Sequence, residues 1–322
     1  MAGETPRVGV GTMETMSGAH VARRSPVWEE RSAWRDYLAL AKPAITLFIV
    51  LVGVAGYLLA SPGTIVLRPF VLLIACGASA SAGAAMLNHY LDRDVDAQMR
   101  RTRHRPLPAH RIARGYRVAV LGLVFSGIGV GVATWAINWL AGVAILSGGF
   151  TYVVIYTYLL KRRSSWNIVI GGFAGSAPAL AGSAAAVGHI TPGVWAFALL
   201  VFLWTPPHFW SLALLLKDDY REAGLPMLPR MNDLKFSGRM VLLSAALLVP
   251  ATVLVGLLGP VNEAVFIALL ALAAGFVVVT LPLATSVGSR PAKRAFLYSA
   301  MYLLFVVVAL GANSVIAGVR PF

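Results

Sequence analysis

Three aspartates and an asparagine lie within nine residues of one another near residue 90. Asn88, Asp92 and Asp96 are four residues apart, so on a helix they share one face while Asp94 points away from it. Like charges in such a row repel by roughly a few tenths of a kcal/mol per pair unless a cation joins them. Their oxygens suit Mg²⁺, which takes one or two carboxylates together with waters and phosphates. We predict a Mg²⁺ site at Asn88, Asp92 and Asp96; a solvated loop paired with Arg100 is the alternative.

Basic residues accompany this row on what we predict to be the same membrane face. Arginines stand at 100, 101, 103 and 105, directly after the row. Arginine binds phosphate oxygens through two parallel hydrogen bonds, so a carboxylate row followed by arginines can hold both a metal ion and a diphosphate. The predicted diphosphate contacts are Lys42, Arg101, Arg105, Lys161 and Arg162. For each of them the alternative is a charge that only anchors the chain at the membrane surface.

A second acidic segment follows the sixth apolar run. It contains Asp218, Asp219, Glu222 and Asp233. The two acidic segments occupy equivalent places if the chain is read as two four-helix units plus a ninth helix, so we predict that they face each other. Asp218 and Asp219 are predicted metal ligands. The spacing leaves open which of Asp218, Asp219 and Glu222 binds the metal, and we favour Asp219.

The composition indicates the environment in which these residues lie. Of the 322 residues 58% are hydrophobic and only 12% are charged, against about 25% charged in soluble domains. This excludes a soluble globular domain and a disordered chain. Nine apolar runs are long enough to cross a hydrocarbon core of about 30 Å. They lie near residues 44–61, 70–91, 118–135, 139–159, 168–187, 194–216, 240–259, 264–285 and 297–317. We predict an all-α, polytopic protein in the lipid bilayer.

The basic residues predict how the chain is oriented. With the N-terminus inside, all of the 27 lysines and arginines except Arg68 and Arg320 fall on the cytoplasmic side, as the positive-inside rule requires. The C-terminus then lies outside. Because topology explains the net charge of +14, no nucleic-acid partner is predicted. The start of the chain lacks a transit-like amphipathic segment, which favours a bacterial plasma membrane.

Two further features concern organisation. Residues 1–35 lack an apolar run and are predicted to form a flexible cytoplasmic tail, with residues 36–322 as the membrane domain. Small residues crowd the run from Gly171 to Ala186 and recur at Gly127 and Gly131. Such spacings let helices approach closely, so we predict that these glycines pack against neighbouring helices.

With these residues located, the chain resembles the UbiA superfamily of intramembrane prenyltransferases, and within it the haem-modifying branch. The matching motifs are Asn88-x-x-x-Asp92-x-Asp94-x-Asp96-x-x-Met99-x-Arg101-Thr102-x-x-Arg105-Pro106-Leu107-Pro108, Tyr156-Thr157-x-x-Leu160-Lys161-Arg162, Asn167-Ile168-Val169-Ile170-Gly171-Gly172, Trp204-Thr205-Pro206-Pro207-His208-Phe209-Trp210 and Asp219-Tyr220-x-x-Ala223-Gly224-x-Pro226-Met227-Leu228-Pro229. The first marks the superfamily, and the last two point to the haem branch.

The resemblance implies nine helices around a central cavity, with Mg²⁺ joining the acidic clusters to farnesyl diphosphate. It implies transfer of the farnesyl group to a vinyl group of haem B with addition of water, giving haem O. The implied catalytic residues are Asp92, Asp96, Asp219 and Lys161. A hand-off of the product to a haem A synthase is a further expectation. An aromatic quinone precursor or chlorophyllide as acceptor is the alternative within the superfamily, and a membrane transporter is the alternative from another class.

His208 carries the haem-specific expectation. Trp204 is expected to line a tetrapyrrole pocket, with simple packing as the alternative, and Asn167 is expected to orient phosphate or substrate, with helix capping as the alternative. A histidine inside a membrane span is costly and usually functional. His208 is predicted either to contact haem or bind its iron as an axial ligand, or to make a hydrogen bond between helices beside Pro206 and Pro207. If the helix continues, His208 and Asp219 lie on nearly one face, because 11 residues are about three turns. His89 is expected to point away from the metal row.

Overall fold

Nine helical spans are long and apolar enough to cross a membrane within residues 33–228 and 233–319, which are the residues that this computed structural model describes. Each corresponds to one of the predicted apolar runs, in the same order. No strand occurs in that part of the chain. The prediction of an all-α protein with nine spans is therefore confirmed. Of the predicted tail, residues 1–35, residues 1–32 lie outside the part of the chain that the structure describes.

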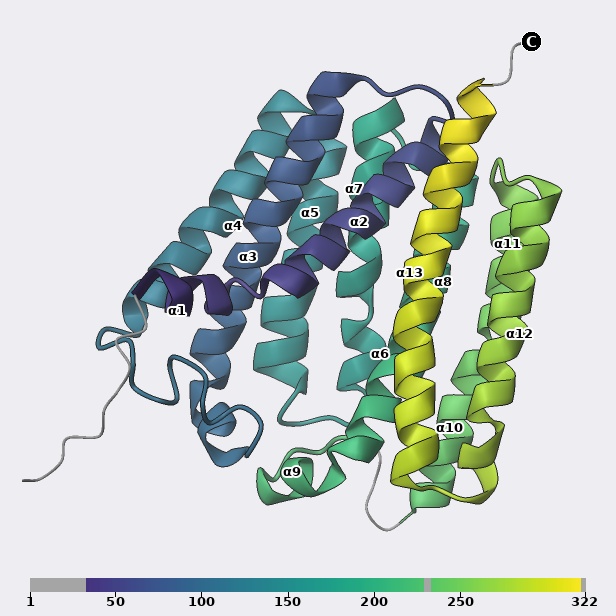
Figure 1. Cartoon of the computed structure of the whole chain (residues 1–322). Helices are drawn as coiled ribbons and strands as arrows, with labels where there is room; N and C mark the ends of the chain where they lie inside the picture. Colours follow the sequence, from purple (N-terminus) through teal and green to yellow (C-terminus); the bar gives the residue numbers. More distant parts are fainter. Residues whose placement is uncertain (1–32, 229–232, 320–322) are drawn as a thin grey trace, which may run out of the picture. The chain divides into compact units, whose positions relative to one another are not determined.

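Several of the spans are built from two consecutive helices. The helices are α1 (Ala33–Leu40), α2 (Pro43–Ala60), α3 (Leu67–Gln98), α4 (Tyr116–Ala136), α5 (Trp139–Phe150), the π-helix η1 (Thr151–Leu160), α6 (Asn167–Gly171), α7 (Phe173–Val187), α8 (Pro192–Leu215), α9 (Lys217–Glu222), α10 (Leu234–Ala246), α11 (Leu248–Leu258), α12 (Glu263–Thr285) and α13 (Ser289–Val319). Figure 1 shows the loop after α3, the connection between η1 and α6, and α9 at the same end of the helices.

Two helices run further than their apolar runs indicate. α3 continues to Gln98 although its run ends near residue 91, and α13 begins at Ser289 rather than near 297. A hydropathy run marks only the part of a helix that suits hydrocarbon, whereas polar residues can continue the same helix beyond it. The extension of α3 keeps Asn88 and Asp96 on one unbroken helix, as the spacing of the acidic row requires.

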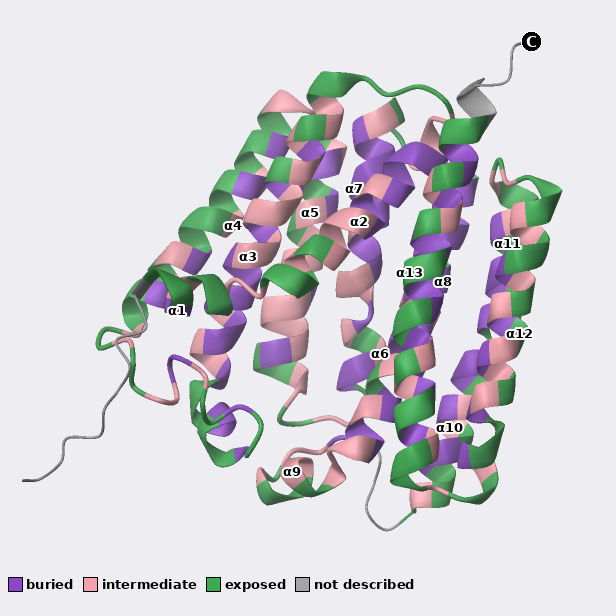
Figure 2. Ribbon diagram, viewed as in Figure 1, coloured by how far each residue is buried: buried purple, intermediate pink, exposed green. Residues whose placement is uncertain are grey.

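α8 is among the most buried spans and α4 among the most exposed. Of the most apolar stretch of α8, 61% of the residues are buried, against 22% for α4 and for α12. Figure 2 shows the same contrast along the ribbons. α8 packs on α7, α11 and α13, so side chains on α8 are enclosed by protein on several sides. This placement gives His208 and Trp204 protein neighbours.

Glycines bring α2 and α7 into close contact. A Cβ added at Gly182 would collide with the carbonyl oxygen of Gly53 and would lie 2.6 Å from the backbone nitrogen of Tyr57. Gly56 faces Ala179 in the same way. The small residues predicted to pack within residues 171–186 do so here, because backbone meets backbone at this contact.

We expect Gly182→Ala to destabilise the protein by about 1–3 kcal/mol, the usual cost of forcing an extra carbon into a packed contact. Thermal unfolding in detergent checks this as a lower Tm. Gly127→Ala is the matched control, because a Cβ there meets nothing within 4 Å. Equal melting temperatures for the two variants would contradict the packing role of Gly182.

The packing role predicted for Gly127 and Gly131 is wrong. Both are exposed on α4, with no neighbour within 4 Å of an added Cβ. Gly122 and Gly129 of the same helix make the close contact instead, against Gly83 and Cys76 of α3. Glycine spacing indicates which residues share a face but not whether that face meets protein or lipid.

Candidate active site

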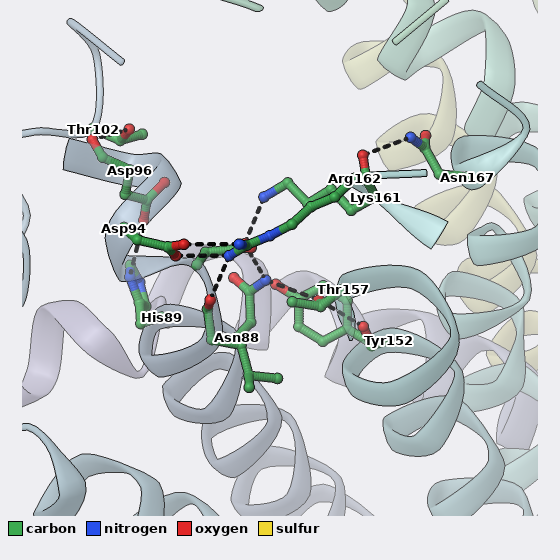
Figure 3. Close-up of polar contacts among 12 residues, drawn as sticks. Asn88, His89, Asp94, Asp96, Thr102, Tyr152, Thr157, Lys161, Arg162 and Asn167 are labelled. Atoms are coloured by element: carbon green, nitrogen blue, oxygen red, sulfur yellow. Dashed lines mark hydrogen bonds and ion pairs between the residues drawn. The ribbon is translucent and has the colours of Figure 1, made fainter. Parts of the chain in front are cut away.

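The predicted row on α3 is buried and continuous. Asn88, Asp92 and Asp96 are 3%, 1% and 2% exposed. The Asn88 side-chain amide donates to Asp92 Oδ2 at 2.8 Å and to Thr157 Oγ1 at 3.0 Å. Figure 3 shows Asn88 beside Thr157 and Tyr152, with Asp96 further along the helix. Burial of two carboxylates is costly unless cations compensate them.

Three cations from three different segments compensate the row. Lys161 Nζ lies 2.5 Å from Asp92 Oδ2, and Arg105 Nη1 lies 2.6 Å from Asp96 Oδ2. Lys42 Nζ donates to Asn88 Oδ1 at 2.7 Å. The structure thus brings six side chains predicted from the sequence to one place: Lys42, Asn88, Asp92, Asp96, Arg105 and Lys161.

Lys42 sits in a strained backbone position at the start of α2. Its φ of 48° lies in the left-handed region, which is uncommon for residues other than glycine. Burial, followed by repulsion from the Arg105 guanidinium, lowers the pKa of Lys42 to about 8. Lys42 therefore holds its proton less tightly than an exposed lysine does. Strain of this kind persists only where the surrounding structure fixes the residue.

The loop after α3 folds back onto the helix end and so delivers Arg105. Thr102 is 1% exposed, and its hydroxyl donates to the Asp96 carbonyl oxygen at 2.9 Å. The Arg105 backbone nitrogen then donates to the Thr102 carbonyl oxygen at 2.9 Å. Through this short turn the Arg105 side chain comes back to the carboxylate of Asp96, nine residues earlier in the chain. Thr102 is therefore a supporting residue of the site.

A π-helix positions Lys161. On an α-helix, at about 100° per residue, Tyr152 and Lys161 would point in opposite directions. Residues Thr151–Leu160 are a π-helix, whose i to i+5 bonding makes a wider turn. Both side chains consequently reach the same cluster, since Tyr152 Oη accepts from Lys42 at 3.0 Å while Lys161 pairs with Asp92. The sequence did not point to Tyr152, because nothing in it signals a π-helix, and it placed Thr157 in a motif without assigning it a role.

Arg162 lies beside the cluster and is turned outward. It makes two hydrogen bonds of 2.7 Å to Asp94, and both side chains are partly exposed. The structure therefore places Asp94 off the row, as the spacing predicts, and gives it its own partner. A diphosphate contact at Arg162 stays a prediction.

An exposed ion pair joins the second acidic segment to the loop that follows the row on α3. Arg100 Nη2 lies 2.8 Å from Glu222 Oε1, which joins the loop after α3 to α9. Asp218 pairs with Arg221 at the surface, 3.4 Å apart. Asp219 is half-buried. The metal roles of Asp218 and Asp219 stay predictions.

Arg101 extends the contact between these two loops. It lies near Tyr220, the residue after Asp219: burial raises the pKa of the Tyr220 hydroxyl, and the positive charge of Arg101 partly opposes that rise. Arg101 is exposed. The two loops that carry the acidic residues therefore lie side by side.

A divalent cation fits the donor set of the α3 row. Within residues 33–228 and 233–319, no three acidic, histidine or cysteine side chains converge as a ready-made metal cage. Asp92 Oδ1, however, is buried without a hydrogen-bond partner, and such an atom is costly unless something binds it. Mg²⁺ commonly uses one or two carboxylates and takes its other ligands from water and phosphate. The row suits a cation that arrives with a phosphate ligand.

His89 lies closer to the row than expected. Its Nδ1 is 4.0 Å from Asp96 Oδ2, and both of its ring nitrogens are buried without a hydrogen-bond partner. Residues seven apart are two helical turns apart and share a face, so the expectation that His89 points away from the row was wrong.

His208 and Trp204 form an aromatic wall against α13. Their ring centroids are 4.4 Å apart and stacked. His208 Nδ1 lies 2.7 Å from Ser299 Oγ, and Trp204 Nε1 donates to the Ser299 carbonyl oxygen at 2.7 Å. The predicted hydrogen bond between helices is therefore present. α8 ends at Leu215, so His208 and Asp219 do not share a continuous helix as predicted.

Asn167 lies beneath the cluster. It is 0% exposed, and its amide nitrogen lies 3.4 Å from the Lys161 carbonyl oxygen and 3.4 Å from Met227 Sδ. These contacts tie the start of α6 to the backbone of Lys161. Direct contact of Asn167 with a substrate stays a prediction.

Comparisons with known proteins agree with this geometry. The model of the UbiA prenyltransferase family matches residues 46–306. The chain belongs to this family. UbiA relatives include the protoheme IX farnesyltransferase of Erythrobacter litoralis, 37% identical over 87% of this chain and 92% of that protein, and protoheme IX farnesyltransferase 1 of Paramagnetospirillum magneticum, 42% identical over 87% and 98%. The resemblance stated from the motifs is thus confirmed.

Solved structures of the family share the fold. A UbiA homolog from Archaeoglobus fulgidus bound to DMAPP and Mg²⁺ superposes with a TM-score of 0.64 at 17% identity, over 86% of this chain and 99% of that chain. A structure described as digeranylgeranylglyceryl phosphate synthase in membranes gives a TM-score of 0.73 at 18% identity, over 88% and 98%. Membership in a prenyltransferase family removes the transporter alternative.

Proposed function

We propose that the protein transfers the farnesyl group of farnesyl diphosphate to a vinyl group of haem B, with addition of water, to give haem O. The relatives named protoheme IX farnesyltransferase, which match most of the chain, support this acceptor and donor. The observation that carries the chemistry is the buried row in which Asn88 and Lys161 both bind Asp92 Oδ2 while Asp92 Oδ1 has no hydrogen-bond partner. Haem B is a substrate of this reaction.

The proposed metal is Mg²⁺, held by Asn88, Asp92 and Asp96 with Asp219 or Asp218 from α9. The Mg²⁺ in the related Archaeoglobus structure supports this choice. When bound, the metal ion would neutralise charge on the departing diphosphate. Asn88 is held for this role, because its amide donates to Asp92 and Thr157 while its oxygen accepts from Lys42.

Lys161, Arg105 and Lys42 stabilise the leaving diphosphate. Each is already directed at the row, and charges fixed in advance at the place where negative charge develops cost no reorganisation during the reaction. In the first step the bond between the farnesyl carbon and the diphosphate oxygen breaks, and the electron pair leaves with the diphosphate. Lys161 and Arg105 then exchange part of their contact with the carboxylates for the new anion.

The resulting allylic cation reacts with the acceptor. A vinyl carbon of haem B forms the new carbon–carbon bond, water adds to the cation left on the tetrapyrrole, and that water loses a proton. The overall change is one farnesyl group and one hydroxyl group gained. The chain shields the reaction because the row lies at the inner end of a bundle whose helices exclude water. No covalent intermediate with the protein is required.

The aromatic wall on α8 is the proposed contact surface for haem. His208 lies about 10 Å from the end of α8 at Leu215, at 1.5 Å per residue. The stacked rings of Trp204 and His208 offer a flat apolar surface with one nitrogen-bearing edge. Such a surface suits a tetrapyrrole better than a small phenol.

The orientation and setting of the protein are part of the proposal. The basic loops support a cytoplasmic N-terminus and active-site end and an outer C-terminus. The bacterial sources of the relatives support a bacterial plasma membrane. The domain boundary near residue 36 and the cytoplasmic tail before it are proposed on composition alone. Delivery of haem O to a haem A synthase in the same membrane is proposed because the product is too apolar to cross water freely.

We expect Arg105→Ala to raise the KM for farnesyl diphosphate about tenfold with a smaller effect on kcat, because it removes one charge-assisted contact to the bound anion. Arg103→Ala is the matched control, since Arg103 is exposed and its nearest partner is the adjacent His104. Steady-state kinetics with varied farnesyl diphosphate separate the two parameters. Unchanged kinetics for Arg105→Ala would remove this residue from the diphosphate site.

The product mass tests the proposed acceptor. Purified protein in detergent is incubated with farnesyl diphosphate, Mg²⁺ and either haem B or an aromatic quinone precursor, and the extract is examined by mass spectrometry. We expect haem to gain a hydroxyl and a farnesyl group and the quinone precursor to remain unchanged. Prenylation of the quinone precursor alone would replace the proposed acceptor.

A further inference from the structure

Ser299 of α13 is hydrogen-bonded on both sides of its hydroxyl. Its Oγ lies 2.6 Å from the Phe296 carbonyl oxygen and 2.7 Å from His208 Nδ1. The sequence motifs did not single out Ser299, which lies 91 residues from His208. It is 0% exposed, so water does not compete for either contact.

The two contacts determine which nitrogen of His208 carries a proton. A hydroxyl has one hydrogen to donate, and a carbonyl oxygen only accepts. The separation of 2.6 Å between Ser299 Oγ and the Phe296 carbonyl oxygen requires the hydroxyl hydrogen to lie between them. Ser299 Oγ must then accept from His208, so Nδ1 carries a proton. In the neutral imidazole the other nitrogen, Nε2, keeps its lone pair.

The surroundings of His208 favour the neutral ring and fix its orientation. Trp204 stacks on one side at 4.4 Å, Phe296 lies at 4.9 Å, and Phe209 meets the ring edge at 5.1 Å between centroids. A positive charge on a ring enclosed in this way inside a membrane span is costly, so the neutral form is favoured. Trp204 also donates a hydrogen bond to the Ser299 carbonyl oxygen, which fixes the stacked Trp204 and His208 rings against α13.

We propose that Ser299 is a positioning residue, which holds His208 as the Nδ1–H tautomer and so presents its Nε2 lone pair to the iron of a tetrapyrrole substrate. The presentation of Nε2 to iron rests on the proposed function, whereas the tautomer of His208 does not. A histidine that binds iron needs a lone pair on the binding nitrogen, and a partner for the other nitrogen sets the tautomer and raises basicity. Ser299 supplies that partner from a different helix.

Nitrogen NMR tests the tautomer without any substrate. The full chain is labelled with ¹⁵N-histidine, and the His208 signals are assigned as those lost in His208→Gln. We expect a protonated Nδ1 and a bare Nε2 in the wild-type protein, and loss of this preference in Ser299→Ala. A protonated Nε2 in the wild-type protein would overturn the proposal, whatever the enzyme does with haem.

Haem titration tests the consequence. We expect Ser299→Ala to weaken binding of ferric haem at least tenfold, in the range that removal of such a partner usually produces, and to alter the absorption band of the bound haem. Ser314→Ala is the matched control, because Ser314 is buried on the same helix and its hydroxyl bonds only the Leu310 carbonyl oxygen among its described neighbours. Ser299→Thr retains a hydroxyl and should restore the binding.

The outcomes separate the two proposals. Haem binding by Ser299→Ala that equals that of Ser314→Ala would overturn the positioning role, even if wild-type protein farnesylates haem. The expected tautomer in a protein that does not farnesylate haem would instead contradict the proposed function and leave the role of Ser299 in setting the His208 proton intact.

Discussion

Asp92→Asn is expected to lower kcat at least 10²-fold while leaving the protein folded. Asp92 is the most buried carboxylate of the row, and its Oδ1 has no partner in the protein. The amide keeps the shape of the side chain but removes the charge that would hold a divalent cation. Loss of one group that stabilises the departing charge costs roughly 10²–10³ in kcat. Turnover at saturating substrates and Mg²⁺ measures this loss.

Asp94→Asn is the matched control for this experiment. It makes the same chemical change two residues away on the same helix, but Asp94 is exposed and pairs with Arg162 off the row. We expect at least half of the wild-type kcat and a similar melting temperature. Equal activity in the two variants would show that position on the row does not matter, and the metal assignment would fail.

The second large effect is expected for Lys161→Ala, which should also lower kcat about 10²-fold. Lys161 Nζ lies 2.5 Å from Asp92 Oδ2 and is mostly buried, so its charge is already in place where the diphosphate departs. Turnover is measured at saturating farnesyl diphosphate, so that weaker binding alone does not explain the loss. The melting temperature is recorded in parallel, because removal of Lys161 leaves a buried carboxylate without its cation.

Arg163→Ala provides the comparison for Lys161. Arg163 is exposed two residues further along, where a charge that serves only topology would lie. We expect its removal to leave kcat within a factor of two of the wild-type value. If Lys161→Ala turns over as fast as Arg163→Ala, the basic end of η1 is only a membrane anchor.

Most of the fold could be predicted because hydropathy and charge report directly on a membrane. The nine spans follow from the apolar runs, and the prediction held even for α8, which runs unbroken through Pro206 and Pro207. The helix ends could not be read in the same way. The extension of α3 to Gln98 and the start of α13 at Ser289 depend on polar segments that hydropathy does not describe.

The part of the site that lies on one helix could be predicted from helical periodicity. Asn88, Asp92 and Asp96 could be placed on one face from their spacing alone. The partners that come from elsewhere in the chain, such as Tyr152 and Ser299, could not. Tyr152 reaches the cluster because η1 is a π-helix, and Ser299 meets His208 only because α8 packs on α13. Such contacts between distant segments depend on tertiary packing, which a single sequence does not specify.

The location of a bound metal ion would show whether a divalent cation and the diphosphate meet at the α3 row. Crystals of the protein with Mn²⁺ in place of Mg²⁺ and an unreactive thio analogue of farnesyl diphosphate would show the metal by anomalous scattering. We predict Mn²⁺ at roughly 2.0–2.6 Å from oxygens of Asp92 and Asp96, with the diphosphate against Lys161 and Arg105. Mn²⁺ bound only at α9, or a diphosphate bound away from the row, would contradict it.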